Sequence, residues 1–408
     1  MLQGKLKRCA IPILLAGLPQ VNYADPLMFD VGPVLVRPRL DIEELFDDNI
    51  TYAAKNEKSD FITSVNPGIG LSLGQPEWNN VIVNLSLPDR IYAQNPNSDY
   101  IGQNFALEGV YQGSNFTIKA HELYVNTYGY LGGATFGQIN PLWFQNFQDS
   151  LEFGYDIGGK TTLYLKTAYN AAEFERSILS LVDYEDFRGT FGASYHYTSQ
   201  TSFFLEGYTG EVVTQRESIA PGLALPRAQY YGVFGGVQGS LGSRFEWYAK
   251  GGYEIRDYSN DTSAPGAVVA ELDLKYHLND ATRFDLKYVR ANQASINYAG
   301  VNYVYDQVFA AVDYKFGKRE KLEAVGSVSY SDFSYQGVGY NGRVDSPITL
   351  TADLKYHFNR WLTGDIGYQF INFSSTGANV LSYEVQRTFV MLSIGYDQLP
   401  ENQHDYSK

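Results

Sequence analysis

One stretch of strict two-residue alternation, 268–290, constrains the fold of this chain more than any other feature. Leu272, Leu274 and Tyr276 fall on one side of an extended chain, and acidic and basic residues fall on the other. The polar residues 277–280 interrupt the pattern, which then resumes. A period of two is typical of β-strands, and a short polar break between two such runs predicts an antiparallel hairpin.

The same hairpin recurs along the chain at intervals of forty residues. The segment DLKYHLND begins at Asp273, DYKFGKRE begins at Asp313 and DLKYHFNR begins at Asp353. Aromatic residues stand just before each of these polar turns. Repeated hairpins with aromatic residues at the strand ends are the units of transmembrane β-barrels.

Composition narrows the possible classes of protein. The chain has 408 residues with 34 tyrosines and 39 glycines, and it contains no run of about eighteen apolar residues such as a membrane-spanning helix needs. Its single cysteine, Cys9, excludes a disulfide framework. The formal net charge of -14 argues against a nucleic-acid partner.

The amino terminus predicts export. Lys5, Lys7 and Arg8 precede a short apolar run, and Ala24 is a suitable last residue before a cleavage site. We therefore expect a signal peptide over residues 1–24. The rest of the chain divides into a barrel over residues 25–396 and a polar carboxy-terminal tail over residues 397–408.

Short turns alternate with long connections from one end of the chain to the other. Long connections are expected at 128–146, 171–185, 211–227 and 335–345, and the segments between turns number about eighteen. The pattern predicts an all-β protein, a transmembrane antiparallel up-and-down β-barrel of about 18 strands with short periplasmic turns and long extracellular loops. Its expected location is the outer membrane of a Gram-negative cell, in contact with outer-membrane lipid. A soluble solenoid or propeller is the alternative.

The charged face of the strands predicts the lining of a lumen. Only a closed barrel leaves no unpaired strand edge in lipid, so the apolar face must meet lipid and the charged face must point inward. Such a lining keeps a pore wet, although the same residues would also suit a plugged barrel whose interior groups pair with one another. The candidate pore-lining residues are Arg244, Glu246, Lys250, Glu254, Arg256, Glu271, Asp273, Lys275, Arg283, Asp285, Lys287, Asp353 and Lys355.

Nothing in the sequence predicts an enzyme. The chain has five histidines, and no histidine can be assigned to a serine nucleophile from the sequence. The acidic segments 47–49 and 257–261 offer oxygen ligands for calcium, yet they lack the spacing of an EF-hand loop and are better explained as solvated loop acids. No catalytic residue, metal site or cofactor is therefore expected.

Four short segments near the amino terminus resemble the opening of a family of outer-membrane β-barrel porins. They are RPRL at 37–40, FDDNI at 46–50, SDFI at 59–62 and NPG at 66–68, and the later DYKFGKRE-like turns fit the same family. Members accompany genes for exopolysaccharide or capsule synthesis and export. The resemblance implies a conduit for a secreted polysaccharide that works with periplasmic polysaccharide-export proteins. A porin for small polar solutes is the alternative, and a surface receptor or adhesin is a third.

Overall fold

The computed structural model describes residues 27–75, 79–129, 142–174, 183–215, 227–258, 264–294, 302–317, 321–336, 342–377 and 382–395. The expected signal peptide and the carboxy-terminal tail lie outside the described residues. The strands are β1 (Phe29–Val31), β2 (Val34–Asp47), β3 (Asp60–Gln75), β4 (Asn79–Ser86), β5 (Asp89–Tyr92), β6 (Tyr100–Ile101), β7 (Gln103–Gln112), β8 (Phe116–Gly129), β9 (Leu142–Ile157), β10 (Thr161–Phe174), β11 (Asp183–Thr198), β12 (Thr201–Gln215), β13 (Ala228–Leu241), β14 (Phe245–Tyr258), β15 (Ala264–Asn279), β16 (Thr282–Ala294), β17 (Asn302–Phe316), β18 (Leu322–Gln336), β19 (Val344–Asn359), β20 (Leu362–Thr376) and β21 (Tyr383–Gly395).

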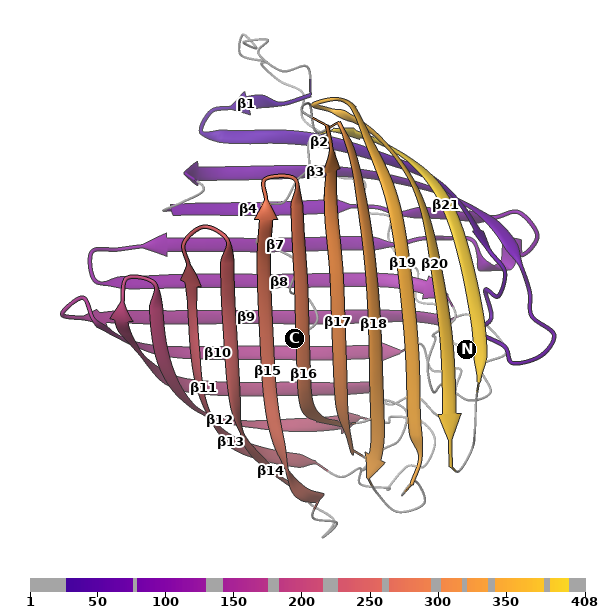
Figure 1. The fold of residues 1–408 in the computed structure, drawn as a ribbon. Coiled ribbons are helices and arrows are strands. Elements are labelled where there is room, and N and C mark those ends of the chain that lie inside the picture. The colour runs from indigo at the N-terminus through magenta and orange to yellow at the C-terminus, as the bar shows by residue number, and fades with distance from the viewer. Residues whose placement is uncertain are drawn as a thin grey trace, which may run out of the picture.

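These strands form one antiparallel sheet that closes on itself (Figure 1). Closure is made by β2 and β21, which pair from Arg39 opposite Gly395 to Asp47 opposite Arg387. The two sets of strands β3–β12 and β15–β21 run across one another in Figure 1, as the tilted strands on opposite walls of a barrel do. The short strand β1 is a hairpin partner of β2.

Two of the barrel strands are interrupted, and a proline explains one of the breaks. β4 and β5 pair with β3 in one continuous register, with Ser86 opposite Gly68 and Asp89 opposite Val65. The break between them contains Pro88, which has no backbone N–H to donate to the ladder. β6 and β7 are likewise two parts of one strand beside them. The twenty-one strands, without β1 and with each interrupted strand counted once, therefore make a barrel of eighteen, as the sequence predicts.

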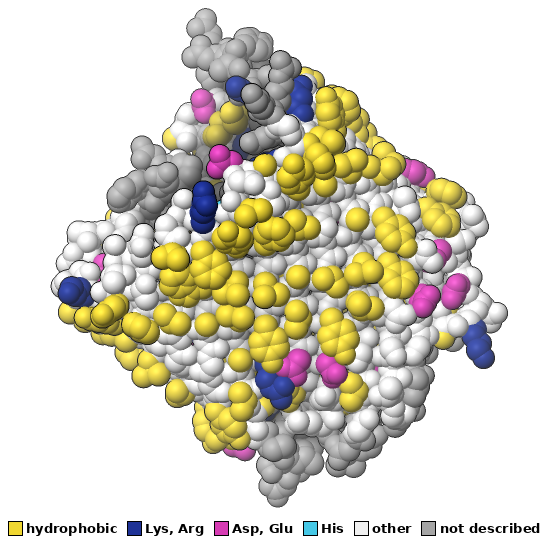
Figure 2. Space-filling model, in the orientation of Figure 1, with side chains coloured by type: hydrophobic (Ala, Val, Ile, Leu, Met, Phe, Trp, Pro, Cys, Tyr) yellow, Lys and Arg dark blue, Asp and Glu magenta, His cyan; other side chains and the backbone are white. Residues whose placement is uncertain are grey.

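The outer face of the barrel is apolar. On β11 the side chains of Phe187, Phe191 and Tyr195 are exposed, and on β19 those of Leu350 and Leu354 are exposed. Each of these residues alternates along its strand with residues of the opposite face. Figure 2 shows apolar side chains over most of the visible wall, with charged side chains mainly toward its margins.

Aromatic side chains gather beside the short turns on this outer face. Tyr314 and Phe316 at the end of β17 have ring centroids 4.6 Å apart, and Tyr356 and Phe358 at the end of β19 have centroids 4.9 Å apart. All four side chains are exposed. A closed barrel with an apolar outer wall and an aromatic girdle is an outer-membrane protein of a Gram-negative cell. None of the described residues belongs to a helix that is long and apolar enough to cross a membrane.

The strands are longer at the loop end than the sequence suggests. β8 to β12, together with β18 and β19, extend into all four of the expected long connections, 128–146, 171–185, 211–227 and 335–345. Sequence alternation fades in these extensions, because a strand beyond the bilayer no longer needs an apolar outer face. Glu185, for example, lies two residues from the exposed Phe187 and has the same orientation. The backbone ladder continues past the point where the apolar pattern stops.

Candidate functional site: the inner wall

Twelve of the thirteen candidate pore-lining residues lie on strands β14, β15, β16 and β19, whereas Arg244 lies in the turn before β14. Register places the strand residues on one face, because directly opposed residues project to the same side of a sheet. Lys250 is opposite Glu271, and Asp273 is opposite Lys287. This face alternates with the exposed apolar one and is the inner wall of the closed barrel.

Charges of opposite sign pair along this wall. The Lys250 ammonium lies 2.8 Å from a carboxylate oxygen of Glu271. The Arg256 guanidinium lies 3.0 Å from a carboxylate oxygen of Glu254. Lys287 and Asp273 are 3.6 Å apart. Arg283 contacts Asp285 at 3.2 Å and Asp313 at 3.6 Å. The wall is therefore strongly polar, although most of these candidate residues are partly neutralised by a neighbour.

Aromatic rings on β12 and β13 lie flat against the inner wall because glycines stand opposite them. Tyr208 is directly opposite Gly232, and Tyr230 is directly opposite Gly210. A Cβ atom added to either glycine would lie 2.4 Å from the Cζ atom of the facing tyrosine. Phe234 has the same relation to Gly252 on β14. The missing side chains thus leave the space that each ring occupies.

A cation lies over each of these three rings. The guanidinium carbon of Arg188 is 3.8 Å from the Tyr208 ring centroid. That of Arg256 is 4.7 Å from the Tyr230 centroid, and the Lys250 ammonium is 5.0 Å from the Phe234 centroid. A cation is attracted to the negative face of an aromatic ring. We call these units glycine–ring–cation stacks, and each holds a positive charge at a fixed place on the wall.

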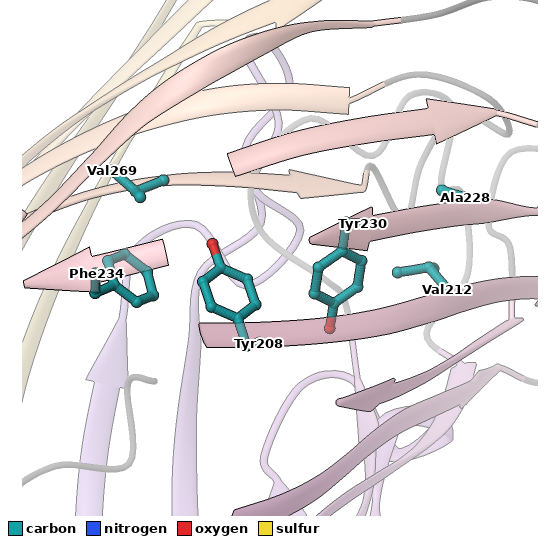
Figure 3. Packing of buried hydrophobic residues seen from close by; sticks show 6 residues of the cluster. All are labelled: Tyr208, Val212, Ala228, Tyr230, Phe234 and Val269. Carbon is teal, nitrogen blue, oxygen red and sulfur yellow. The ribbon is translucent and has the colours of Figure 1, made fainter. Parts of the chain in front are cut away.

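The ring hydroxyls bind carboxylates between the stacks. Tyr208 donates to Glu254 at 3.0 Å, and Tyr230 donates to Asp186 at 2.6 Å. Figure 3 shows the two tyrosines side by side, with their hydroxyls pointing in opposite directions and Phe234 beyond Tyr208. Because each carboxylate accepts a hydrogen bond from a tyrosine hydroxyl, the tyrosines hold the two negative charges in place on the wall as well as filling space.

Gly232→Val should destabilise the folded barrel by about 1–3 kcal/mol, because the added methyl groups collide with the Tyr208 ring and overpack the wall. The change is measured by urea unfolding of the protein in lipid vesicles. Gly207→Ala on β12 is the matched control, because nothing lies within 4 Å of a Cβ at that position. A similar loss in both variants would show that the ring does not depend on the glycine.

Of the two acidic segments weighed from the sequence as calcium sites, the segment 47–49 has a structural role. Asp47 binds the Arg387 guanidinium at 2.7 Å and accepts the backbone N–H of Asn49 at 2.8 Å. Asp48 accepts the N–H of Gln386 at 2.7 Å, so this segment anchors its loop across the barrel closure. Of the segment 257–261, residues 259–261 lie outside the described residues. In the described part of the chain, no group of three or more metal-ligating side chains is close enough to hold a metal ion.

One serine–histidine contact lies on the inner wall near a short turn. His196 Nδ1 is 2.8 Å from Ser202 Oγ, and His196 Nε2 is 3.3 Å from Thr162 Oγ1. The nearby carboxylate of Asp156 accepts the Thr162 hydroxyl at 2.7 Å rather than orienting the histidine. This geometry differs from a catalytic triad, in which a carboxylate holds the base directly. A polar cross-strand contact explains it.

Comparison with known proteins places the chain only at the level of architecture. No family model matches it, and no curated protein matches it. Solved structures do match. OccAB4 of Acinetobacter baumannii has 11% identity, covers 90% of this chain and 99% of its own, and gives a TM-score of 0.45. The outer membrane protein opdK of Pseudomonas aeruginosa has 12% identity, with 88% and 99% coverage and a TM-score of 0.45.

A third match is OccK2 of Pseudomonas aeruginosa, solved in complex with glucuronate, with 12% identity, 88% and 98% coverage and a TM-score of 0.42. Identity and TM-score at this level carry no argument about solute or mechanism. The barrel class that the resemblance implies is supported by the closed sheet of the structure itself, and the association with polysaccharide export finds no support among these matches.

Proposed function

We propose that the chain is a passive channel through which small polar solutes cross the outer membrane. The observation that carries this proposal is a closed barrel of eighteen strands whose inner wall is polar and carries charges of both signs. A barrel of 16–18 strands is wide enough to enclose an aqueous channel. The twelve strand residues expected to line the pore are proposed to keep that channel wet.

Mixed charge on the wall favours passage of polar solutes in general over strong selection by sign. Lys250, Glu271, Asp273 and Lys287 are largely neutralised in pairs, so the field that they project into the lumen is local. Polysaccharide export, which the resemblance implies, rests on that resemblance alone. The uptake of small solutes is therefore the main proposal, and periplasmic export proteins are not needed for it.

Swelling of vesicles that contain the purified protein tests the proposal. We expect swelling in isotonic glucose, and slower swelling as the solute grows from a monosaccharide to a tetrasaccharide, because a channel of fixed width admits small solutes faster. Protein-free vesicles and vesicles with heat-unfolded protein are the controls. An absence of swelling with every solute would indicate a plugged barrel and overturn the proposal. Loss of surface polysaccharide on gene deletion would instead restore the export hypothesis.

A further inference from the structure

Two neighbouring cations of the inner wall have no ion partner among the described residues. Arg188 on β11 and Lys166 on β10 make no ion pair within the described chain, although Lys250 and Arg256 beside them each hold a carboxylate. The Nε atom of Arg188 is buried and has no hydrogen-bond partner. The Nε donor is therefore closed to the lumen, and the terminal nitrogens of the guanidinium are the donors available for a ligand.

Register brings these two cations together. Arg188 is directly opposite Ala168, and Lys166 is two residues further along the same strand. Diagonal positions of this kind are separated by about 7–8 Å, which is within reach of two long side chains. Stacking of Arg188 on Tyr208 at 3.8 Å fixes the guanidinium plane against the wall. The ammonium of Lys166 can approach the same group from the neighbouring strand.

The nearest carboxylates on β11 and β12 are already hydrogen-bonded to tyrosines. Asp186 accepts the Tyr230 hydroxyl at 2.6 Å, and Glu206 accepts the Tyr164 hydroxyl at 2.7 Å. Neither of them forms an ion pair with Arg188 in the described chain. The tyrosines therefore keep these carboxylates in place without neutralising the arginine.

From this arrangement we infer that Arg188 and Lys166 form an anion-binding station on the lumen wall, which takes the carboxylate or phosphate group of a small solute in transit. A guanidinium donates two parallel hydrogen bonds to an oxyanion, and an ammonium adds a compact positive charge. The surrounding carboxylates make binding weak, which allows release on the far side. The inference rests on the proposed channel function and names the class of solute that this wall retains.

Current recordings in planar bilayers test the station with gluconate, glucose 6-phosphate and glucose as probes. We expect the two anions to interrupt the current of the parent channel and neutral glucose to leave it unchanged. Arg188→Gln should shorten the interruptions about tenfold, because the bidentate contact is lost. Lys166→Gln should shorten them less, and Arg188→Lys should give an intermediate duration because it keeps the charge without the planar fork.

Lys315→Gln on β17 is the matched control, since it removes one positive charge far from this station along the wall. Its interruptions should keep their parent duration. Equal shortening in Lys315→Gln and Arg188→Gln would show a general charge effect and overturn the station, and so would equal interruption by glucose. Interruption by only one of the two anions would assign the site to carboxylates or to phosphates.

A second measurement distinguishes failure of the proposed channel function from failure of the anion-binding station. If the parent protein conducts no current, the proposed function is wrong, and saturation-transfer NMR on the detergent-solubilised protein still tests the station. Gluconate or glucose 6-phosphate should then show transfer from the parent and much less from Arg188→Gln. Equal transfer from both proteins would overturn the site independently of conduction.

Discussion

Leu350→Arg should destabilise the membrane-embedded barrel by about 2–4 kcal/mol, because an arginine on the lipid face near the bilayer midplane has no water to solvate its charge. Leu350 lies near the middle of β19 and is 42% exposed on the outer wall. Its direct neighbours on that wall are Val328 and Phe370. Urea unfolding in vesicles, followed by tryptophan fluorescence, measures the change.

The adjacent residue supplies the control. Thr351 belongs to the inner wall, where it is opposite Ser327 and Gln369, so Thr351→Arg should leave its charge in water at little cost. Leu286→Arg on β16 repeats the test at a second site, opposite Leu274 and Ala310. A larger loss of stability for Thr351→Arg than for Leu350→Arg would mean that the inner and outer faces have been assigned the wrong way round.

The barrel itself could be predicted because each of its determinants is local in sequence. Alternation within a strand indicates which residues face lipid and which face the lumen. Recurring turns such as those after Asp273 and Asp353 indicate where the hairpins lie. Closure by β2 and β21 joins residues at least 340 positions apart, as between Asp47 and Arg387. That the sheet closes could nevertheless be predicted, because an open sheet in lipid would leave two unpaired edges.

The stacks on the inner wall could not be predicted, because they depend on register between strands. The pore-lining residues predicted from the sequence lie on β14 to β16 and β19, where charged residues recur at alternate positions. Arg188 was missed because the inward positions that follow it on its strand are Thr190, Gly192 and Ser194, so the alternation of charge stops there. That Tyr208 lies opposite Gly232 follows from the exact offset of two strands joined by a turn. The one sequence signal for these stacks is that glycine is frequent in strands whose inward-facing residues include aromatic ones.

A buried ion pair at the loop end also escaped the sequence. Arg343 and Asp345 are 0% and 1% exposed, and the guanidinium binds both carboxylate oxygens at 3.0 Å. Ser375 donates to the same carboxylate at 2.6 Å, which ties β19 to β20. The Arg343 guanidinium also lies 5.2 Å from the Tyr335 ring centroid on β18. Arg343, which lies outside the strands, thus contacts β18 and β19, and its partner Asp345 binds β20.

Arg343→Met should therefore destabilise the barrel by about 3–5 kcal/mol, because it leaves the Asp345 carboxylate buried without a counter-charge. The double variant Arg343→Met/Asp345→Leu should recover most of that loss, since an apolar pair needs no compensation. Arg290→Met is the matched control on an exposed pair, in which Arg290 and Asp306 are 37% and 35% exposed, and it should cost about 0–1 kcal/mol. All variants are compared by urea unfolding in the same vesicles. A loss for Arg343→Met no greater than that for Arg290→Met would show that water reaches Asp345 and that the pair does not hold the three strands together.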